Sequence, residues 1–248
     1  MRNGKRSVLA VILVLGFLGG ACANVFESFG DKGSRDAKLE EARIALDEGD
    51  FTTAVALLEP LSDQYPGDTE ISRSLASAYA GRGGLNFFDL AARAEAAQNA
   101  RNSGSAQGNT IGHLVSAFPH PVTDTNISDL STAVALMENI SSSSGDPNDF
   151  YSLGLFYSAK AILMVLKDTD SSGDGIPDTF TSLALSDADA ETVYGSLDSA
   201  LANFGSGKAG LDVSSEILES SGDLKSEIDA RPGTTTGDKL RTYLGSAF

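Results

Sequence analysis

The sequence predicts an all-α protein in which helical hairpins continue into an array or bundle of about eight or nine helices. Three observations lead to this expectation. Apolar residues recur at intervals of three and four along most of the chain, strand-like alternation is scarce, and Gly- or Pro-containing breaks follow the periodic segments. With 41% hydrophobic residues, the 248-residue chain can also bury a sizeable core.

The first half of the array is predicted from four periodic segments. They indicate helices at about 37–48, 51–65, 69–80 and 85–100, separated by short breaks that contain Gly. Asp68 stands where an acidic side chain can cap the third helix. Short connections favour antiparallel neighbours, so we expect two successive helical hairpins.

The second half is predicted to contain helices at about 128–140, 150–167, 186–201 and 211–229, followed by a last short helix. The segment 150–167 is apolar nearly all round, which is typical of a helix buried by its neighbours. A lysine and several Ser and Gly residues make it a poor membrane span. We therefore expect it to be the central core helix.

The ends of these helices are predicted from capping and turn-forming residues. Ser186 and Asp189 resemble a capping box at the start of a helix. The serine run 141–144 is expected to form a loop. Gly205 is expected to end a helix in the left-handed conformation, because the surrounding residues lack the full pattern of a phosphate-binding loop.

Residues 35–90 carry small and bulky residues at the spacing of a known helical repeat. They resemble the tetratricopeptide repeat, whose 34-residue unit packs a small residue of one helix against a bulky residue of the next. Glu41 departs from the pattern, and an unrelated antiparallel helix pair with a Gly turn is the alternative. The resemblance implies a helical array that binds a partner, and it depends on Ala42, Ala45, Gly49, Phe51, Ala54, Leu58, Leu61, Pro66, Leu75, Ala76, Tyr79 and Gly83.

The N-terminus has the three zones of a signal peptide. A basic start is followed by an apolar run over 8–18 and by the small residues before Cys22. As a helix, eleven residues span roughly 16 Å, and the hydrocarbon core of a bilayer is about 30 Å thick. We therefore interpret residues 1–21 as a signal peptide, which indicates an exported protein.

Cys22, the only cysteine, is expected to carry lipid. Gly19-Gly-Ala-Cys22 resembles a bacterial lipobox, although a leucine is usual where Gly19 stands. The resemblance implies diacylation of Cys22, a tether over 22–36, and location on the periplasmic face of the envelope, with Ala23 typical of outer-membrane sorting. The alternative is an Ala21-Cys22-Ala23 signal-peptidase site, which would release a soluble protein.

The segment 168–178 carries oxygen-bearing side chains at alternate positions. Counted from Asp170, they fall at positions 1, 3, 5 and 9, with Gly at 6 and an apolar residue at 7 whose carbonyl faces inward. This order resembles the first part of an EF-hand loop and the Asp-rich loops of dockerin and thrombospondin type 3 repeats. The resemblance implies a calcium site whose predicted ligands are Asp168, Asp170, Ser172, Asp174, Ile176 and Asp178.

The calcium loop lacks its usual last ligand. Thr181 stands at position 12, where an EF-hand has a bidentate Glu, so binding is expected to be weak, about 10⁻⁴–10⁻³ M. An acid of the next helix, such as Asp187, is a candidate to complete the ligand set. The alternative interpretation is an acidic surface loop that joins two helices.

Charge and composition exclude several classes of function. The net charge of −16 becomes −19 without the three basic residues of the signal peptide, so nucleic acid is an unsuitable partner. Only His113 and His120 are present, without the partners of a zinc-protease motif, and we expect no enzyme activity.

These observations predict a non-enzymatic envelope lipoprotein with the all-α domain over 37–248. Residues 35–90 form its repeat-like hairpins, and 127–248 form the helical remainder that holds the calcium loop. We expect a protein partner in the envelope, since the hairpins are similar to those of outer-membrane assembly lipoproteins of the BamD type. The alternative is an accessory ligand-binding lipoprotein similar to the T components of TRAP transporters, with a closed pocket beside the core helix.

Overall fold

The computed structural model describes residues 33–86, 118–173, 185–208, 222 and 224–247, and over these residues the chain is all-α without strands. This confirms the predicted fold class. A further helical stretch covers 224–229. In chain order the helices are α2 (Arg35–Asp47), α3 (Phe51–Gln64), α4 (Thr69–Arg82), α7 (Asp124–Ser144), α8 (Pro147–Thr169), α9 (Asp187–Lys208) and α11 (Thr236–Ala247).

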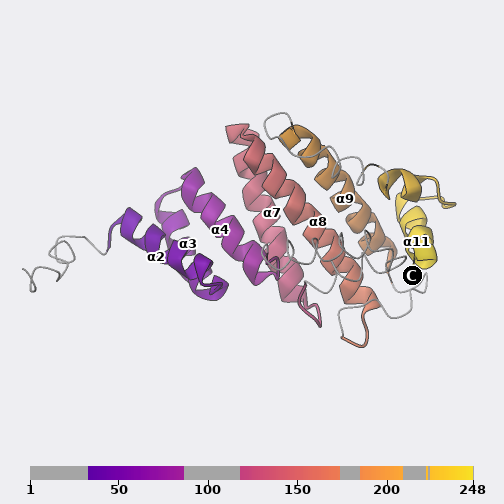
Figure 1. The fold of residues 1–248 in the computed structure, drawn as a ribbon, viewed down its shortest axis with the longest axis horizontal. Coiled ribbons are helices and arrows are strands. Elements are labelled where there is room, and N and C mark those ends of the chain that lie inside the picture. The colour runs from indigo at the N-terminus through magenta and orange to yellow at the C-terminus, as the bar shows by residue number, and fades with distance from the viewer. Residues whose placement is uncertain (1–32, 87–117, 174–184, 209–221, 223, 248) are drawn as a thin grey trace, which may run out of the picture.

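The helices lie side by side, largely in the order of the chain (Figure 1). The first three pack on one another, α4 packs on α7, and α8 lies between α7 and α9, with α11 against α9 at the other end. Each inner helix therefore contacts a neighbour on two sides. Among the helices that the structure describes, α2 lies at one edge of the array and α11 at the other.

Acidic caps and glycine turns define the first hairpins. The side chains of Asp50 and Asp68 accept hydrogen bonds from backbone N–H groups in the first turns of α3 and α4. Gly49 (φ +76°) and Gly67 (φ +84°) adopt left-handed conformations in the turns, where any side chain would be strained. The apolar sides of the three helices enclose one cluster, made of Leu39, Ala42, Ala45, Ala54, Val55, Leu58, Leu61, Ile71, Leu75 and Ala78.

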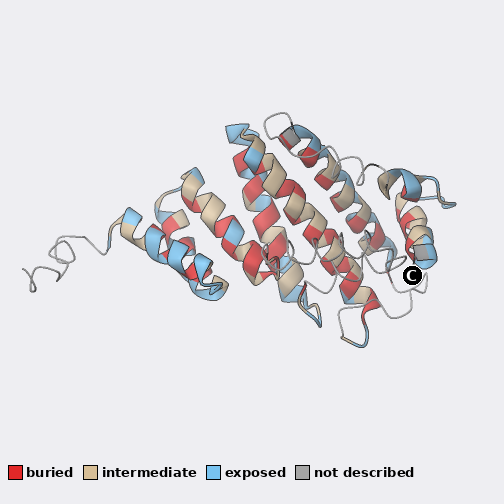
Figure 2. Cartoon of the chain, viewed as in Figure 1, coloured by how far each residue is buried: buried red, intermediate tan, exposed pale blue. Residues whose placement is uncertain are grey.

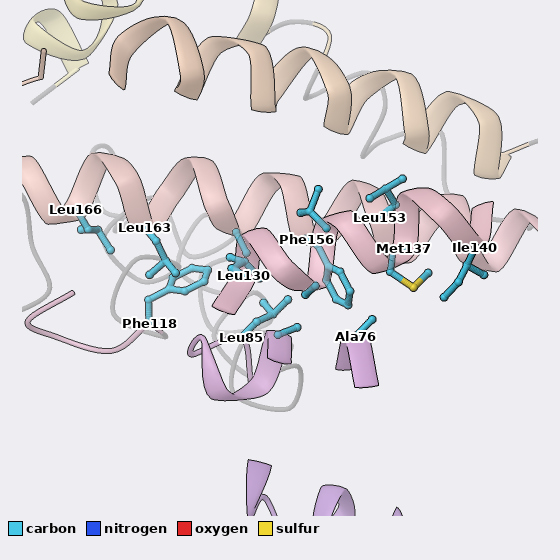
Figure 3. Packing of buried hydrophobic residues seen from close by; sticks show 14 residues of the cluster. Ala76, Leu85, Phe118, Leu130, Met137, Ile140, Leu153, Phe156, Leu163 and Leu166 are labelled. Atoms are coloured by element: carbon cyan, nitrogen blue, oxygen red, sulfur yellow. The ribbon is translucent and has the colours of Figure 1, made fainter. Parts of the chain in front are cut away.

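The largest cluster of buried side chains lies between α4, α7 and α8 (Figure 3). Phe156 and Leu163 of α8 are 1% and 0% exposed there. Within the described part of the chain, α8 is the one helix long and apolar enough to cross a membrane by length and composition. Figure 2 shows buried residues along α7 and α8, as expected for helices with neighbours on both sides.

Two ion pairs connect α4 to the second half of the array. Arg73 Nε and Nη2 donate to Asp149 Oδ1 and Oδ2 at 2.7 and 2.8 Å. Arg82 makes the same two-bonded contact with Asp129, at 2.7 Å for both bonds. The two aspartates are buried, with side-chain exposures of 4% and 7%. Because the arginines belong to one helix, together they fix how α4 sits on α7 and α8.

The serine run 141–144 is helical, so the prediction of a loop there was wrong. It forms the last turn of α7, which ends at Gly145 with φ +64°. The Ser143 hydroxyl donates to the backbone carbonyls of Asn139 and Ile140, as serines do within helices. The glycine, and not the serines, ends the helix.

Gly205 does not end a helix, so that prediction was also wrong. It lies inside α9, which continues to Lys208, and it is not among the described glycines with positive φ. The reason is tertiary: this part of α9 packs on the start of α8. A Cβ on Gly207 would lie 3.1 Å from the carbonyl oxygen of Pro147.

The predicted start of α9 is confirmed, since the Ser186 hydroxyl accepts from the N–H of Asp189.

Candidate functional site

The helices α4 and α8 repeat one sequence pattern relative to their caps. Leucine, a small residue and tyrosine stand seven, eight and eleven residues after the N-cap aspartate in both helices. In α4 these are Leu75, Ala76 and Tyr79 after Asp68. In α8 they are Leu153, Gly154 and Tyr157 after Asp146. Only the first set was predicted from the sequence, although the spacing of the second is readable from the chain.

The tyrosine of each pattern binds a carboxylate on the neighbouring helix. The Tyr79 hydroxyl donates to Glu59 of α3, and the Tyr157 hydroxyl donates to Glu138 of α7. Burial and the Glu138 carboxylate raise the pKa of Tyr157 to about 12. The hydroxyl therefore stays protonated and remains a donor at any physiological pH. The same kind of contact thus joins α3 to α4 and, separately, α7 to α8.

Close packing of small residues against aromatic rings accompanies this pattern. A Cβ on Gly154 would lie 2.7 Å from the ring of Phe204 in α9. In the first hairpins, a Cβ on Gly81 would lie 2.3 Å from the ring of Phe51 in α3. Both helix pairs therefore approach as closely as they do because a side chain is absent. In both places a small residue of one helix packs against an aromatic ring of another.

The described start of the predicted calcium loop is a compact turn after α8. The Asp170 carboxylate Oδ1 accepts the Gly173 N–H at 2.8 Å and the Ser172 hydroxyl at 3.3 Å. Gly173 has φ +72°, which favours glycine. Predicted ligand positions 1 and 3 are therefore in contact. Asp174, Ile176 and Asp178 lie outside the described residues, as does Cys22.

Acidic groups from the starts of α7 and α9 act on Asp168, at the end of α8 just before this turn. Burial and the negative charge of Asp189 raise the pKa of Asp168, and Asp124 adds to this effect. The ammonium of Lys167 pairs with Asp124. The helices concerned are the end of α8 and the starts of α7 and α9. A nearby cation would offset both causes of the raised pKa of Asp168, the burial of its carboxylate and the repulsion by Asp189.

The acid of α9 whose charge raises the pKa of Asp168 is Asp189, and the role of Asp187 as a last ligand stays a prediction. Asp187 is paired with Arg241 of α11, at 2.5 Å between Oδ1 and Nη1. Arg241 also binds Asp238, so it fixes the start of α9 against α11. Among the described residues no group of three or more His, Cys, Asp or Glu side chains could hold a metal ion. Any complete ligand set would have to include residues beyond them.

Comparison with protein-family models, with curated proteins and with solved structures gives no match for this chain. The resemblances to the tetratricopeptide repeat, the lipobox and the calcium loops therefore stay predictions based on the residues named above. The same holds for the pocket that a transport role would require.

The one described histidine, His120, is exposed, and its Nδ1 lies 2.8 Å from the carbonyl oxygen of Phe118.

Proposed function

We propose that this protein is a non-enzymatic, lipid-anchored scaffold of the bacterial cell envelope, whose helical array binds a partner protein. The observation that carries the proposal is the repeated hairpin, in which leucine, a small residue and a bonded tyrosine recur at equal spacing in α4 and α8. Leu-small-x-x-Tyr is also the spacing in the first helix of the tetratricopeptide repeat. Such arrays present long surfaces suited to holding other proteins.

The proposed anchor stands a short length of chain before the first described helix. Cys22 precedes the start of α2 at Arg35 by about 13 residues, which at ~3.3–3.6 Å per residue reach about 45 Å when extended. Two acyl chains on Cys22 would hold the protein stably at a membrane. The apolar character of α8 has a separate explanation, because that helix supplies the core between α7 and α9.

The calcium loop has a structural role in this proposal. It connects the end of α8 to the start of α9, where Asp168 and Asp189 repel one another. A hard cation bound by Asp168, Asp170 and the further loop residues would neutralise this repulsion and fix the two helix ends. Titration calorimetry of the protein with Ca²⁺ should give a binding heat, and chelation should lower the melting temperature. No heat together with an unchanged melting temperature would rule the site out.

Affinity capture tests the scaffold role. The tagged protein should be cross-linked in intact cells, captured from solubilised envelopes, and compared with an exported Cys22→Ala variant that lacks the anchor. We expect one discrete protein partner with both forms, because the array and not the lipid makes the contact. Proteins captured only with the anchored form would be membrane neighbours. A result with no partner common to both forms would contradict the proposal.

A further inference from the structure

The outer side of α2 is an uncovered face at the edge of the described array. This 13-residue helix buries Leu39, Ala42 and Ala45 against its neighbours, and its other side carries exposed residues (Figure 2). Ile44 lies on that side with 52% of its surface exposed, and it is the one large hydrophobic side chain exposed among the described residues. A single exposed isoleucine is unremarkable by itself. The charged residues around Ile44 distinguish it from an isolated exposed side chain.

Four exposed or largely exposed carboxylates surround Ile44. Glu40, Glu41, Asp47 and Glu48 stand four and three residues before it and three and four residues after it. At about 100° per residue, all four lie within about 60° of Ile44 around the helix axis. Glu40 is 3.9 Å from Arg43, and the other three have no cationic partner among the described residues. The outer face of α2 therefore presents one exposed apolar side chain with four carboxylates around it, which we call the acidic ring.

Both arginines of α2 pair with acidic residues at the start of α4, and Arg43 also lies 3.9 Å from Glu40 of the acidic ring. Arg35 binds Asp68 and Glu70 at 2.6 and 2.7 Å, and Arg43 binds Glu70 at 2.6 Å, so both are held at α4. Lys38 lies about 120° around the helix from Ile44, at about 100° per residue. The fold thus holds both arginines of α2 at Glu70 of α4, and the outer face of α2 is left predominantly acidic.

We propose that this face docks a cationic helical segment of a partner protein, with lysines or arginines around a small aliphatic recess that receives Ile44. A helix laid along α2 would continue the side-by-side packing of the array (Figure 1). The inference rests on the proposed scaffold function and names the chemistry of its partner. Contacts around one apolar anchor and exposed charges give weak, rapid and salt-sensitive binding.

The same charges argue against other occupants. Anionic lipid headgroups and nucleic acid would be repelled by the carboxylates. A second copy docked face to face would set each acidic ring against the other, because a two-fold contact uses the same patch on both subunits. A single metal ion is unsuitable, since Glu40 and Glu48 lie about 12 Å apart along the helix at ~1.5 Å per residue. A cationic protein segment can contact both Ile44 and the carboxylates around it.

A defined probe tests this surface. The exported protein, held in zwitterionic nanodiscs, should be titrated at low salt with a fluorescent amphipathic peptide that carries one leucine stripe between lysines. Empty nanodiscs serve as the blank. Ile44→Ser should weaken binding about fivefold, and Glu48→Lys about tenfold. The matched control is Asp63→Lys, an equal charge change at an exposed residue of α3, which should change binding less than twofold.

The outcomes separate this inference from the scaffold role. Equal weakening by Glu48→Lys and Asp63→Lys would show attraction by overall charge alone and would overturn the docking surface, as would absence of peptide binding. Melting curves of the variants should match the unmodified protein, because the substituted side chains are exposed. If the captured partner still binds the Ile44→Ser and Glu48→Lys variants, the scaffold function stands and this surface is wrong.

Discussion

Replacing Arg73 by methionine should strongly destabilise the array, because it leaves a buried carboxylate without its cation. The Asp149 side chain is 4% exposed and receives two bonds from Arg73 and one, at 2.6 Å, from the Ser144 hydroxyl. Methionine keeps most of the aliphatic stem and removes only the guanidinium. The loss therefore measures the charge and its hydrogen bonds, and not packing.

The expected cost follows from the exposure of the two partners. Breaking a fully buried ion pair costs about 3–5 kcal/mol. Arg73 is 40% exposed and Ser144 remains as a donor, so water and the hydroxyl offset part of the loss, and we expect about 2–3 kcal/mol. For a protein of this size that lowers the melting temperature by roughly 5–10 °C. Arg43→Met is the matched control, because Arg43 and Glu70 are 45% and 46% exposed, and it should cost under about 1 kcal/mol.

The pH dependence identifies the cause. Hydrogen bonds from Arg73, and then from Ser144, hold the pKa of Asp149 below its usual value. The carboxylate therefore contributes stability that is present above about pH 4 and is lost as the pH falls through the folded pKa. Without Arg73, burial should raise that pKa. The variant should then be least stable relative to the unmodified protein near pH 7 and recover part of the difference near pH 3.

Urea denaturation at several pH values measures this difference directly. The double substitution Arg73→Met with Asp149→Leu should recover most of the lost stability, because it removes the unpaired charge. A loss below about 1 kcal/mol, or an equal loss at pH 3 and pH 7, would refute the argument that the buried charge determines the effect.

The remaining predictions concern helix packing, calcium and the anchor. Gly154→Ala should lower the free energy of unfolding, measured by denaturation, by about 1–3 kcal/mol, because its Cβ would meet Phe204 at 2.7 Å. The control is Gly195→Ala, which has nothing within 4 Å and should stabilise α9 by up to about 1 kcal/mol. Equal effects of the two substitutions would disprove close packing of α8 on α9. Asp168→Asn should raise the melting temperature in the presence of chelator, because the raised pKa of Asp168 means that its ionised form costs stability. The same substitution should abolish stabilisation of the protein by Ca²⁺. Stabilisation by Ca²⁺ that persists in the variant would exclude Asp168 as a ligand. Mass spectrometry should find a diacylated N-terminus at Cys22, and an unmodified N-terminus beginning after it would contradict lipidation.

Local signals in the sequence predicted much of the helical framework. Asp68 and Ser186 cap helices where expected, because a side chain that binds the N–H groups of the next turn acts over three residues. The apolar pattern of 150–167 likewise predicted a core helix, and the structure extends it by a few residues at each end. Period and capping act within one helix, so they are readable from the chain alone.

The sequence could not predict contacts between helices far apart in the chain. Arg73 and Asp149 are separated by 76 positions, and nothing local marks them as partners. Local propensity was also misleading at the serine run 141–144, where intrahelical hydrogen bonds and the stop at Gly145 decided the outcome.

By itself, the sequence determined the all-α class, the acidic character and most helix starts, because these depend on composition and on neighbours within a few residues. Only the tertiary structure decided that the charge of Asp189 acts on Asp168 and that Arg241 of a later helix binds Asp187. It also decided that Ile44 and its acidic ring face outward, because Leu39, Ala42 and Ala45 of the same helix pack against its neighbours. Which charges are neutralised and which stay exposed depends on the packing of distant segments, and periodicity carries no information about that.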